Sequence, residues 1–278
     1  MKASPNTNID ISIIIVSYNT VKLTLNCLKS LEKSLQNSSL KTEILVVDNA
    51  STDSSPQKIK KNFPQVKLIE NKENQGFAYA NNQAAKKAQG QYLFLLNSDT
   101  LVPQGSLEKM IKFAATQTQL GILAPRLLNF DGSVQNSCFP PQTPAAAFGK
   151  FFLGQKNSLS QYAPPGETPT IVFSAVGAAL LIPRPVWQNL GGFEEKYFMY
   201  FEDLDLCRRA QKAGLKVYYF PSATITHLHG QSAKKEKQKP NLWLNNSSKI
   251  YHGLFKHYLI NLIFFLGQKW QKTKKYLG

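Results

Sequence analysis

Strands and helices are predicted to alternate four times over the first hundred residues, and this order restricts the fold more than any other feature of the sequence. Short apolar runs rich in β-branched residues are typical of buried parallel strands. Leucines spaced three and four apart, such as Leu28, Leu31 and Leu35, indicate a helix packed on a sheet. We expect strands at 11–16, 43–47, 66–70 and 92–96, and helices at 21–35 and about 76–89. The alternation predicts an α/β fold with a Rossmann-like, mostly parallel central sheet flanked by helices.

Polar clusters close three of the predicted strands. They are Ser17-Tyr18-Asn19, residues 48–53 and Asn97-Ser98-Asp99. Ligands of open parallel sheets bind beyond the carboxyl ends of the strands, so we expect these clusters to share one site. No G-x-G-x-x-G follows the first strand and no G-x-x-x-x-G-K-[ST] occurs in the sequence, which argues against nicotinamide-dependent enzymes and P-loop NTPases.

The pattern changes after the first hundred residues. Residues 129–170 are rich in Pro, Gly, Ala and Ser and predict an elaborated loop region. Ordered structure is expected again at 171–182, followed by a helix at about 203–213 and a strand at 216–220. We therefore divide the chain into one domain, residues 1–232, with a nucleotide-binding half at about 11–100 and an acceptor half at about 101–232, and a basic amphipathic C-terminal segment, residues 233–278.

The net charge of +16 is unevenly distributed. Residues 234–278 contain ten lysines and one acid, Glu236, and so supply +9 of it. Within residues 251–278, apolar side chains alternate with lysines over a stretch too short to span a bilayer. This composition favours a segment lying in an anionic cytoplasmic leaflet. The alternative is a C-terminal helix packed on the domain with a solvated lysine-rich end.

The remaining composition predicts a cytoplasmic protein peripheral to the plasma membrane. The first ten residues are polar and lack the features of a signal peptide, and no run of eighteen apolar residues occurs. The three cysteines, Cys27, Cys138 and Cys207, are far apart and fit a reducing compartment.

Two of the strand-end carboxylates are candidates for ligand binding. Asp48 could accept the imide N–H of a uracil or thymine base, or could close an Asx turn. Asp99 could hold Mg²⁺ or Mn²⁺, because such an ion takes one or two carboxylates and completes its shell with water and substrate phosphates. The alternative for Asp99 is also a turn.

Two later clusters carry further candidates. Glu202 and Asp203 open a predicted helix, where acids often only cap free N–H groups. Their functional interpretation is that one carboxylate takes the proton from an attacking hydroxyl. His227-Leu228-His229 follows the last predicted strand, and an imidazole there could bind Mn²⁺ or have only a structural role.

Together these segments resemble family 2 glycosyltransferases of the GT-A fold, and most closely their bacterial rhamnosyltransferase-like branch. The matching stretches are residues 12–19 (SIIIVSYN), 43–53 (EILVVDNASTD), 74–82 (NQGFAYANN), 95–100 (LLNSDT), 191–194 (GGFE) and 200–208 (YFEDLDLCR). The resemblance implies an inverting enzyme with a divalent cation, Mn²⁺ or Mg²⁺, held by Asp99 and His229. Asp203 would be the general base, with Glu202 beside it.

The resemblance also implies a nucleotide-sugar site. Its expected residues are Ser17, Tyr18, Asn19, Asp48, Asn49, Asn74, Gly76, Phe77, Asn82, Asn97, Ser98, Asp99 and Gly177. The expected donor is dTDP-rhamnose, with UDP-hexoses or UDP-N-acetylhexosamines as alternatives, and the expected acceptor is a polysaccharide or a polyprenyl-diphosphate-linked glycan. Asn97 stands where the family's D-x-D motif has its first Asp.

Two rival functions follow from single features. A basic chain could bind nucleic acid, but the excess charge lies mostly in the tail and no helix-turn-helix, zinc or RNP-type motif occurs, so no nucleic-acid partner is expected. A nucleotidyltransferase that forms sugar nucleotides would carry a Gly-rich loop with a basic residue after the first strand, where this chain has Ser17-Tyr18-Asn19-Thr20.

Overall fold

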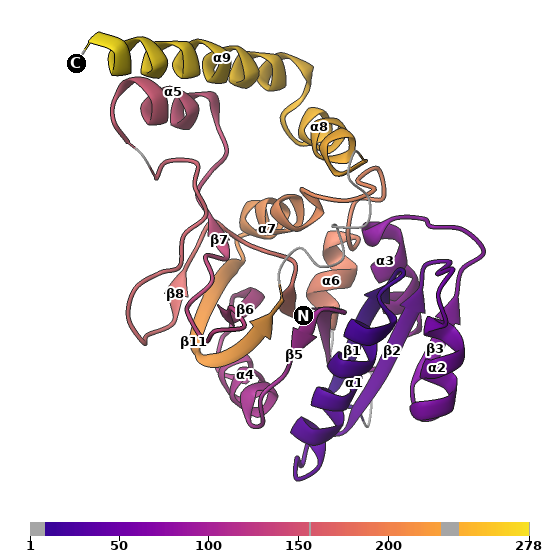
Figure 1. Cartoon of the computed structure of the whole chain (residues 1–278). Helices are drawn as coiled ribbons and strands as arrows, with labels where there is room; N and C mark the ends of the chain where they lie inside the picture. The colour runs from indigo at the N-terminus through magenta and orange to yellow at the C-terminus, as the bar shows by residue number, and fades with distance from the viewer. Residues whose placement is uncertain (1–8, 156, 229–238, 278) are drawn as a thin grey trace.

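The computed structural model describes residues 9–155, 157–228 and 239–277, and it shows one central sheet with helices on both faces (Figure 1). The sheet order is β3-β2-β1-β4-β10-β6-β11-β5, and β8 pairs with β11 beside this path. The predicted α/β fold with a mostly parallel sheet is confirmed.

The first half of the sheet is wholly parallel. Its strands are β1 (Ile11–Ser17), β2 (Thr42–Asp48), β3 (Lys67–Glu70) and β4 (Tyr92–Asn97). The helices between them are α1 (Val21–Leu35), α2 (Ser55–Asn62) and α3 (Phe77–Lys87). The β1–β2 and β1–β4 pairs are in register, with Ser17 opposite Asp48 and Val16 opposite Asn97. The carboxyl ends of these strands therefore lie side by side.

The second half of the sheet is mixed. Its members are β5 (Thr100–Leu101), β6 (Leu120–Leu128), β8 (Thr170–Ile171), β10 (Ala179–Pro183) and β11 (Lys216–His227). Strand β10 runs antiparallel between β4 and β6, while β6 and β11 are parallel. Helices α4 (Ser106–Ala115), α6 (Arg184–Leu190) and α7 (Glu202–Lys212) complete this half. A separate pair, β7 (Cys138–Phe139) and β9 (Ser174–Ala175), lies beside the sheet.

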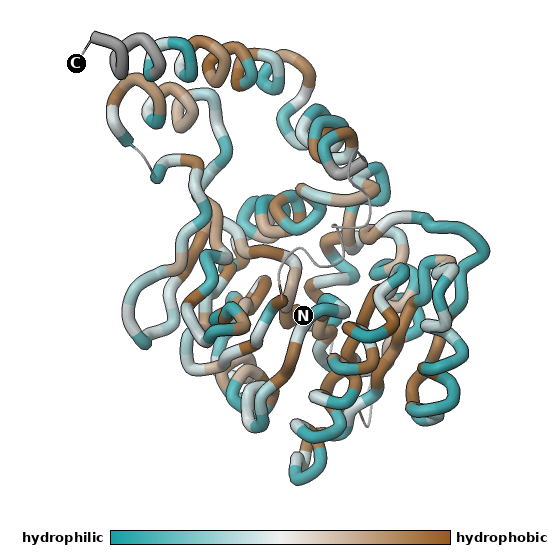
Figure 2. The backbone as a smooth tube through the Cα atoms, in the orientation of Figure 1, coloured by the Kyte–Doolittle hydropathy of each residue, from teal (hydrophilic) through white to brown (hydrophobic). Residues whose placement is uncertain are grey.

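Successive side chains of the strands point to opposite faces of the sheet, and each face has its own hydrophobic core. Ile13 and Ile15 of β1 pack on one face, with Leu28 of α1 and Met110 of α4. Ile14 lies on the opposite face, where helices α3, α6 and α7 pack. Because both faces are covered, the strands of the parallel half read as continuous apolar runs in the sequence. Figure 2 shows β1 and β2 as largely hydrophobic segments within the molecule.

Three helices extend away from the sheet. They are α5 (Pro144–Phe152), α8 (Lys239–His252) and α9 (Leu254–Leu277). In Figure 1, α5 lies along α9 at the top of the molecule. The Phe151 and Phe264 rings meet at a centroid distance of 5.2 Å, and Phe151 also lies against Gly267, where the absence of a side chain permits the close approach. No helix in the described part of the chain is long and apolar enough to cross a membrane.

These helices modify two sequence expectations. Residues 129–170 do not form only loop, because Thr143 caps α5 by accepting a hydrogen bond from the Ala146 amide. The basic segment forms α8 and α9, and α9 packs on α5 instead of the central sheet. The last strand is also longer than predicted, since β11 continues to His227 across a register shift between Phe220 and Thr224.

Candidate active site

The Asp48 carboxylate lies at the end of β2 with one oxygen ready to accept a hydrogen bond. The residue is 2% exposed. Its Oδ2 accepts a hydrogen bond from the Ser51 amide at 2.9 Å, while its buried Oδ1 has no partner among the described residues. Burial raises the pKa of Asp48 above its usual range. A ligand N–H placed against Oδ1 would satisfy this oxygen and stabilise the ionised form.

The polar side chains beside Asp48 mainly shape the loops. Asn19 has a positive φ of 54°, and its Oδ1 accepts from the Thr52 amide at 2.7 Å. The Ser17 hydroxyl is buried and lies 2.9 Å from that of Thr24. Tyr18 between them is half-buried. The structure therefore brings the first two predicted clusters together. Within them, Asp48 Oδ1 has no partner among the described residues, and Tyr18 remains a candidate for ligand contact.

Asn49 anchors the loop that leads into α3. Its Nδ2 donates to Asn74 Oδ1 at 2.8 Å and to the Gly76 carbonyl at 3.2 Å. Its Oδ1 accepts from the Asn71 side chain and the Gln75 amide. Asn49 and Asn74 thus position the segment that carries Gly76 and Phe77, beside the predicted nucleotide-binding cluster.

Gly76 is required by the close approach of another backbone segment. Its φ of 85° and ψ of 171° belong to a region that is essentially restricted to glycine. A Cβ atom built at this position would lie 2.5 Å from the carbonyl oxygen of Phe198. The same carbonyl accepts a hydrogen bond from the Phe77 amide at 2.8 Å.

We expect Gly76→Ala to lower the free energy of unfolding by about 3 kcal/mol or more, because backbone strain and a clash with Phe198 add together. Gly132→Ala is the matched control. Gly132 also has a positive φ, of 82°, but a Cβ atom there would meet nothing within 4 Å. Its cost should be about 1–2 kcal/mol from the backbone alone. Equal losses for the two variants in urea titrations would contradict this account.

Asn82 lies farther along α3 and binds a different segment. Its Nδ2 donates to the Phe193 carbonyl at 2.8 Å and to Glu195 Oε1 at 2.9 Å, and its Oδ1 accepts from the Phe193 amide. The close fit of Gly192 against Asn82 and Trp187 leaves no room for a Cβ atom. In this structure Asn82 therefore fixes the Gly191-Gly192-Phe193 turn to α3, and its predicted contact with the nucleotide sugar stays a prediction.

A short chain of hydrogen bonds connects the Asn97-Ser98-Asp99 cluster to the carboxylate of Asp203. The backbone N–H of Asn97 donates to the carbonyl of Ala178 at 2.9 Å. The next residue back, Gly177, donates its own amide to Asp203 Oδ2 at 2.8 Å. The end of β4, the turn before β10 and the start of α7 are thus connected through two consecutive residues. Among the other members of this cluster, Ser98 Oγ lies 3.2 Å from Thr20 Oγ1 of the first loop.

The start of α7 holds two buried carboxylates. Tyr200 and Phe201 precede it with φ values of 73° and 68°, a left-handed conformation that is uncommon for bulky side chains and typical of functional sites. Asp203 Oδ1 accepts from the Leu204 amide at 2.8 Å, in addition to the Gly177 bond. Glu202 Oε2 is buried with no partner among the described residues.

Burial raises the pKa of both carboxylates. It raises the pKa of Asp203, although the Gly177 and Leu204 amides act in the opposite direction. Burial, and then the charge of Asp203, raise the pKa of Glu202 well above its usual value. A carboxylate whose pKa is raised toward neutrality binds a proton more strongly, as a general base requires.

Asp99 faces a histidine at the end of β11. Asp99 Oδ1 lies 3.4 Å from His227 Nε2, and both side chains are buried. His227 Nδ1 lies 2.8 Å from Gln135 Oε1. An amide oxygen can only accept, so Nδ1 carries a proton and Nε2 is the nitrogen directed at Asp99. The Asp99 carboxylate and the Nε2 nitrogen of His227 therefore face one another.

This geometry bears on the predicted metal ligands. His229 lies outside the described residues, so its role stays a prediction. The sequence offers an imidazole of His227-Leu228-His229 as a possible ligand and the resemblance implies His229, whereas the structure shows His227 beside Asp99. Ala223, Ile225 and His227 occupy alternate buried positions of β11. This alternation is the signal that could have identified His227. In the described part of the chain, no group of three or more His, Cys, Asp or Glu side chains surrounds a common point.

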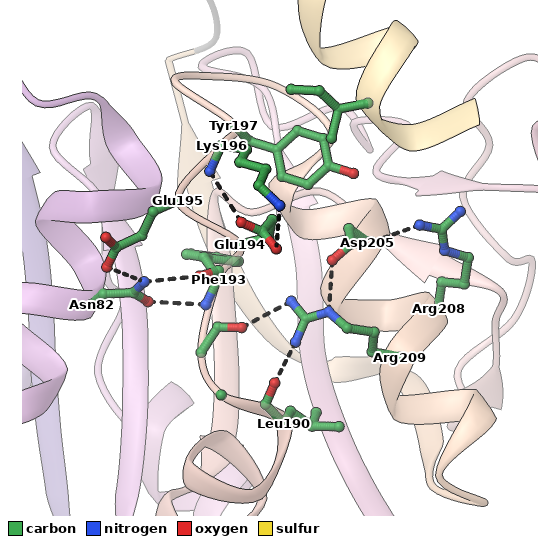
Figure 3. Close-up of a pocket in the computed structure, with 13 residues that line it drawn as sticks. Asn82, Leu190, Phe193, Glu194, Glu195, Lys196, Tyr197, Asp205, Arg208 and Arg209 are labelled. Carbon is green, nitrogen blue, oxygen red and sulfur yellow. Dashed lines mark hydrogen bonds and ion pairs between the residues drawn. The ribbon is translucent and has the colours of Figure 1, made fainter. Parts of the chain in front are cut away.

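A cavity of about 540 Å³ lies beside α7 (Figure 3). It is lined by residues 190–197, Asn82, Asp205, Arg208, Arg209 and Ile250. Arg209 donates to the carbonyls of Leu190 and Gly192 and contacts Asp205 at 2.6 Å. These bonds fasten α7 to the turn held by Asn82. Of the site residues predicted from the sequence only Asn82 lines the cavity, and Asp48, Asp99 and Asp203 do not, so the cavity is separate from the carboxylates of the predicted site.

Known sequences match most of the chain. The sequence model of glycosyl transferase family 2 matches residues 12–157, and that of glycosyl transferase family group 2 matches residues 92–273. N-acetylglucosaminyl-diphospho-decaprenol L-rhamnosyltransferase of Mycobacterium tuberculosis is 31% identical over 231 residues, covering 74% of this chain and 74% of that protein. Rhamnosyltransferase WbbL of Escherichia coli is 26% identical over 167 residues, which is 55% of this chain and 60% of WbbL.

Solved structures share the fold. A mannosyltransferase from Pyrobaculum calidifontis, solved with GDP-Man and Mn²⁺, matches 94% of this chain and 68% of that chain with a TM-score of 0.59 and 18% identity. GalNAc-T7, solved with UDP, GalNAc and Mn²⁺, matches 78% of this chain and 43% of that chain with a TM-score of 0.62 and 16% identity. The family matches and the fold lead to one conclusion: the chain is a glycosyltransferase of family 2, with the GT-A fold, in the rhamnosyltransferase-like branch.

Proposed function

We propose that the protein transfers rhamnose from dTDP-rhamnose to a polyprenyl-diphosphate-linked or polysaccharide acceptor of the cell envelope, with inversion at the anomeric carbon. The two relatives described above are named as L-rhamnosyltransferase and rhamnosyltransferase, and the first is named for a diphospho-decaprenol acceptor. UDP-hexose or UDP-N-acetylhexosamine transfer on the same fold is the alternative.

The observation that carries this proposal is the placement of Asp203. Its carboxylate is held by two backbone amides, and the first of these, from Gly177, is joined through Ala178 to Asn97 at the end of β4. This placement supports a role for Asp203 as the base, because rigid secondary structure holds its carboxylate at the edge of the sheet where β4 ends. An acid that only capped α7 would need no hydrogen bond to Gly177, a residue outside that helix.

The proposed reaction is a single displacement. An acceptor hydroxyl attacks the anomeric carbon, the new glycosidic bond forms as the bond to the nucleotide diphosphate breaks, and Asp203 takes the hydroxyl proton. The amides of Gly177 and Leu204 hold Asp203 in place, and Glu202 lies beside it to bind the acceptor or position the base. Inversion follows from one backside attack, so no covalent intermediate with the protein forms.

Asp99 and His227 fit a divalent cation. The set offers a carboxylate oxygen and an imidazole nitrogen directed at one another, and it leaves the remaining positions to phosphates and water, as Mg²⁺ and Mn²⁺ sites commonly do. When bound, the cation would supply charge stabilisation to the departing diphosphate. Gln135 orients His227 for this role through the bond to Nδ1.

Asp48 is proposed to read the base of the donor. Thymine and uracil carry an N3–H that could donate to Oδ1, whereas cytosine has a bare N3. We expect Asp48→Asn to weaken dTDP binding about 10- to 100-fold, because one of the two donors, the base N–H or the Ser51 amide, would lose its acceptor. Competition titrations check this: wild type should prefer dTDP or UDP over CDP, and the variant should lose most of that preference. An unchanged preference would contradict the role.

The test of the overall proposal is a donor panel. Wild-type protein is titrated with dTDP- and UDP-sugars in Mn²⁺, Mg²⁺ or EDTA, and slow donor hydrolysis is followed. Cation-dependent binding of dTDP-rhamnose above the other donors supports rhamnosyl transfer. Preference for a UDP-sugar supports the alternative, and binding of no nucleotide sugar under any condition contradicts both.

We further propose that the protein works at the cytoplasmic face of the plasma membrane as a peripheral protein. The support is an apolar stripe on α9, formed by Phe255, Tyr258, Leu262, Phe265 and Leu266. These exposed residues recur at intervals of three and four, as on one face of an amphipathic helix. Phe255 alone is 80% exposed, which is costly for a side chain that faces only water.

A further inference from the structure

A second cavity, of about 350 Å³, lies where α7 meets the starts of α5 and α9. Arg208 and Lys212 reach it from α7, Tyr251 and His252 from the end of α8, and Lys256 from the first turn of α9. Residues 141–144, which lead into α5, form another wall. The cavity therefore joins the helix that begins with Asp203 to the pair of helices that extend from the sheet.

The lining of this cavity is strongly cationic. Two lysines and one arginine line it, and none of its described lining residues is an acid. Asp205 pairs with Arg208 at 2.7 Å, but the same carboxylate also pairs with Arg209 at 2.6 Å. No described carboxylate lies within ion-pair distance of Lys212 or Lys256. The positive charge of the cavity is thus largely uncompensated by the protein.

The guanidinium of Arg208 is held in a fixed position by its neighbours. Arg208 lies over the Tyr251 ring at 4.0 Å and donates to the Tyr251 carbonyl at 2.9 Å. Nearby, burial and then the charges of His257, Arg208 and Lys256 lower the pKa of His252 to about 4. His252 is therefore neutral at pH 7 and can donate or accept a hydrogen bond. An ordered guanidinium beside two unpaired ammonium groups is typical of phosphate recognition.

Apolar surface begins directly beside this charge. Phe255, the first member of the apolar stripe of α9, precedes Lys256 in the chain and the stripe continues away from the cavity. Helix α5, which starts at the other wall, exposes Phe148 and is followed by the exposed Leu153. The cationic cavity lies next to the first residue of an exposed apolar stripe. This arrangement suits a ligand with a phosphate at one end and hydrocarbon at the other.

We propose that this cavity binds the phosphate of a lipid whose hydrocarbon lies along the apolar stripe of α9. The inference rests on the proposed membrane placement and deepens it by assigning the residues that recognise the lipid. The phosphate could belong to a polyprenyl diphosphate or to an anionic bilayer lipid, and both present the same oxygen acceptors to Arg208, Lys212 and Lys256.

The test compares two double variants of equal charge. Lys212→Gln with Lys256→Gln removes two cations from the cavity, whereas Lys109→Gln with Lys112→Gln removes two from exposed positions of α4. Each protein is titrated in EDTA with a short-chain polyprenyl diphosphate, and floated with phosphatidylcholine vesicles that contain or lack phosphatidylglycerol. Thermal unfolding of both variants verifies that they are folded.

We expect the cavity variant to bind its lipid about 100-fold more weakly than wild type, about tenfold for each lysine, and the α4 variant to bind as wild type does. Weakening only toward the diphosphate identifies a polyprenyl ligand, and weakening only toward phosphatidylglycerol vesicles identifies a bilayer headgroup. Equal binding by both variants, or an equal loss in both, would overturn the proposal. No nucleotide sugar is present, so a failed donor panel and a failed lipid test are separate results.

Discussion

The variant Asp203→Asn is expected to lower the rate of sugar transfer about 10²- to 10⁴-fold while it still binds the donor, because the amide cannot take the proton of the acceptor hydroxyl. Asn is nearly isosteric with Asp, so the shape of the site is preserved. The side chain can no longer accept from both Gly177 and Leu204, and unfolding should therefore be measured alongside. Single-turnover transfer and donor titration separate the chemical step from binding.

Asp205→Asn is the matched control for Asp203→Asn. Asp205 lies on the same helix and is also buried, but its partners are Arg208 and Arg209. Asp205→Asn should lower the free energy of unfolding, because it weakens the ion pairs of α7. Its rate of transfer per folded molecule should stay higher than that of Asp203→Asn. If the two variants lose transfer equally, the carboxylate of Asp203 supports the helix and is not the base.

The pH profile provides a second readout of Asp203. A general base is inactive when protonated, and burial raises its pKa, so kcat/KM should rise with pH along a limb that lies above the usual range of an Asp carboxyl. Glu202, whose pKa is also raised, shares this titration with its neighbour. The acid limb should be absent from the residual activity of Asp203→Asn.

The second large effect is expected from Asp99→Ala, which should reduce cation-dependent donor binding about 100-fold and remove the difference between Mn²⁺ and EDTA. Its carboxylate is the proposed anionic ligand, and His227 alone would hold a hard cation weakly. Donor titrations with and without EDTA measure the loss. Donor binding that depends on the cation as before would exclude Asp99 as a ligand.

A graded series tests the assigned neighbours of Asp99. Gln135→Leu keeps both proposed ligands but removes the hydrogen bond that orients His227, so cation affinity should fall by about tenfold, less than in Asp99→Ala. Because Gln135 would not touch the cation, an effect as large as that of Asp99→Ala would place it among the ligands.

The parallel half of the fold could be predicted from the sequence because its buried residues recur at the regular spacing of a helix or form the continuous apolar run of a buried strand. Helix α1 spans the predicted residues, and its buried Leu28 and Leu31 follow the apolar spacing. The short helices α2 and α6 were not predicted, since each is only eight or seven residues long and begins with a proline in its first turn. The antiparallel direction of β10 could not be predicted either. An apolar strand buried on both faces has the same sequence pattern in either direction.

The site was predictable where a functional side chain follows a strand and less so where it depends on long-range contact. Asp48 and Asn97 are brought to one edge by the register of β1 with its two neighbours. The contact of Asp99 with His227 instead depends on the pairing of β5 with β11, more than 120 residues apart in the chain, which local patterns do not encode. Asn82 belongs to a motif that predicts contact with the nucleotide sugar, but in the structure its side chain hydrogen-bonds the backbone of Phe193.

The β7–β9 pair has a consequence for how this enzyme could change its acceptor. The segment between Phe139 and Tyr162, including α5, extends from the body, and the chain returns where Tyr162 pairs with Cys138 of β7. Strand β7 is itself held by β9, through Phe139 and Ser174. The turn that holds Asp203 begins only after β9, at Gly177. Recombination where the segment leaves and returns could exchange it between relatives without moving the base. We expect such chimaeras to keep their donor preference, and acceptor assays on them would measure how much of the acceptor preference this segment carries.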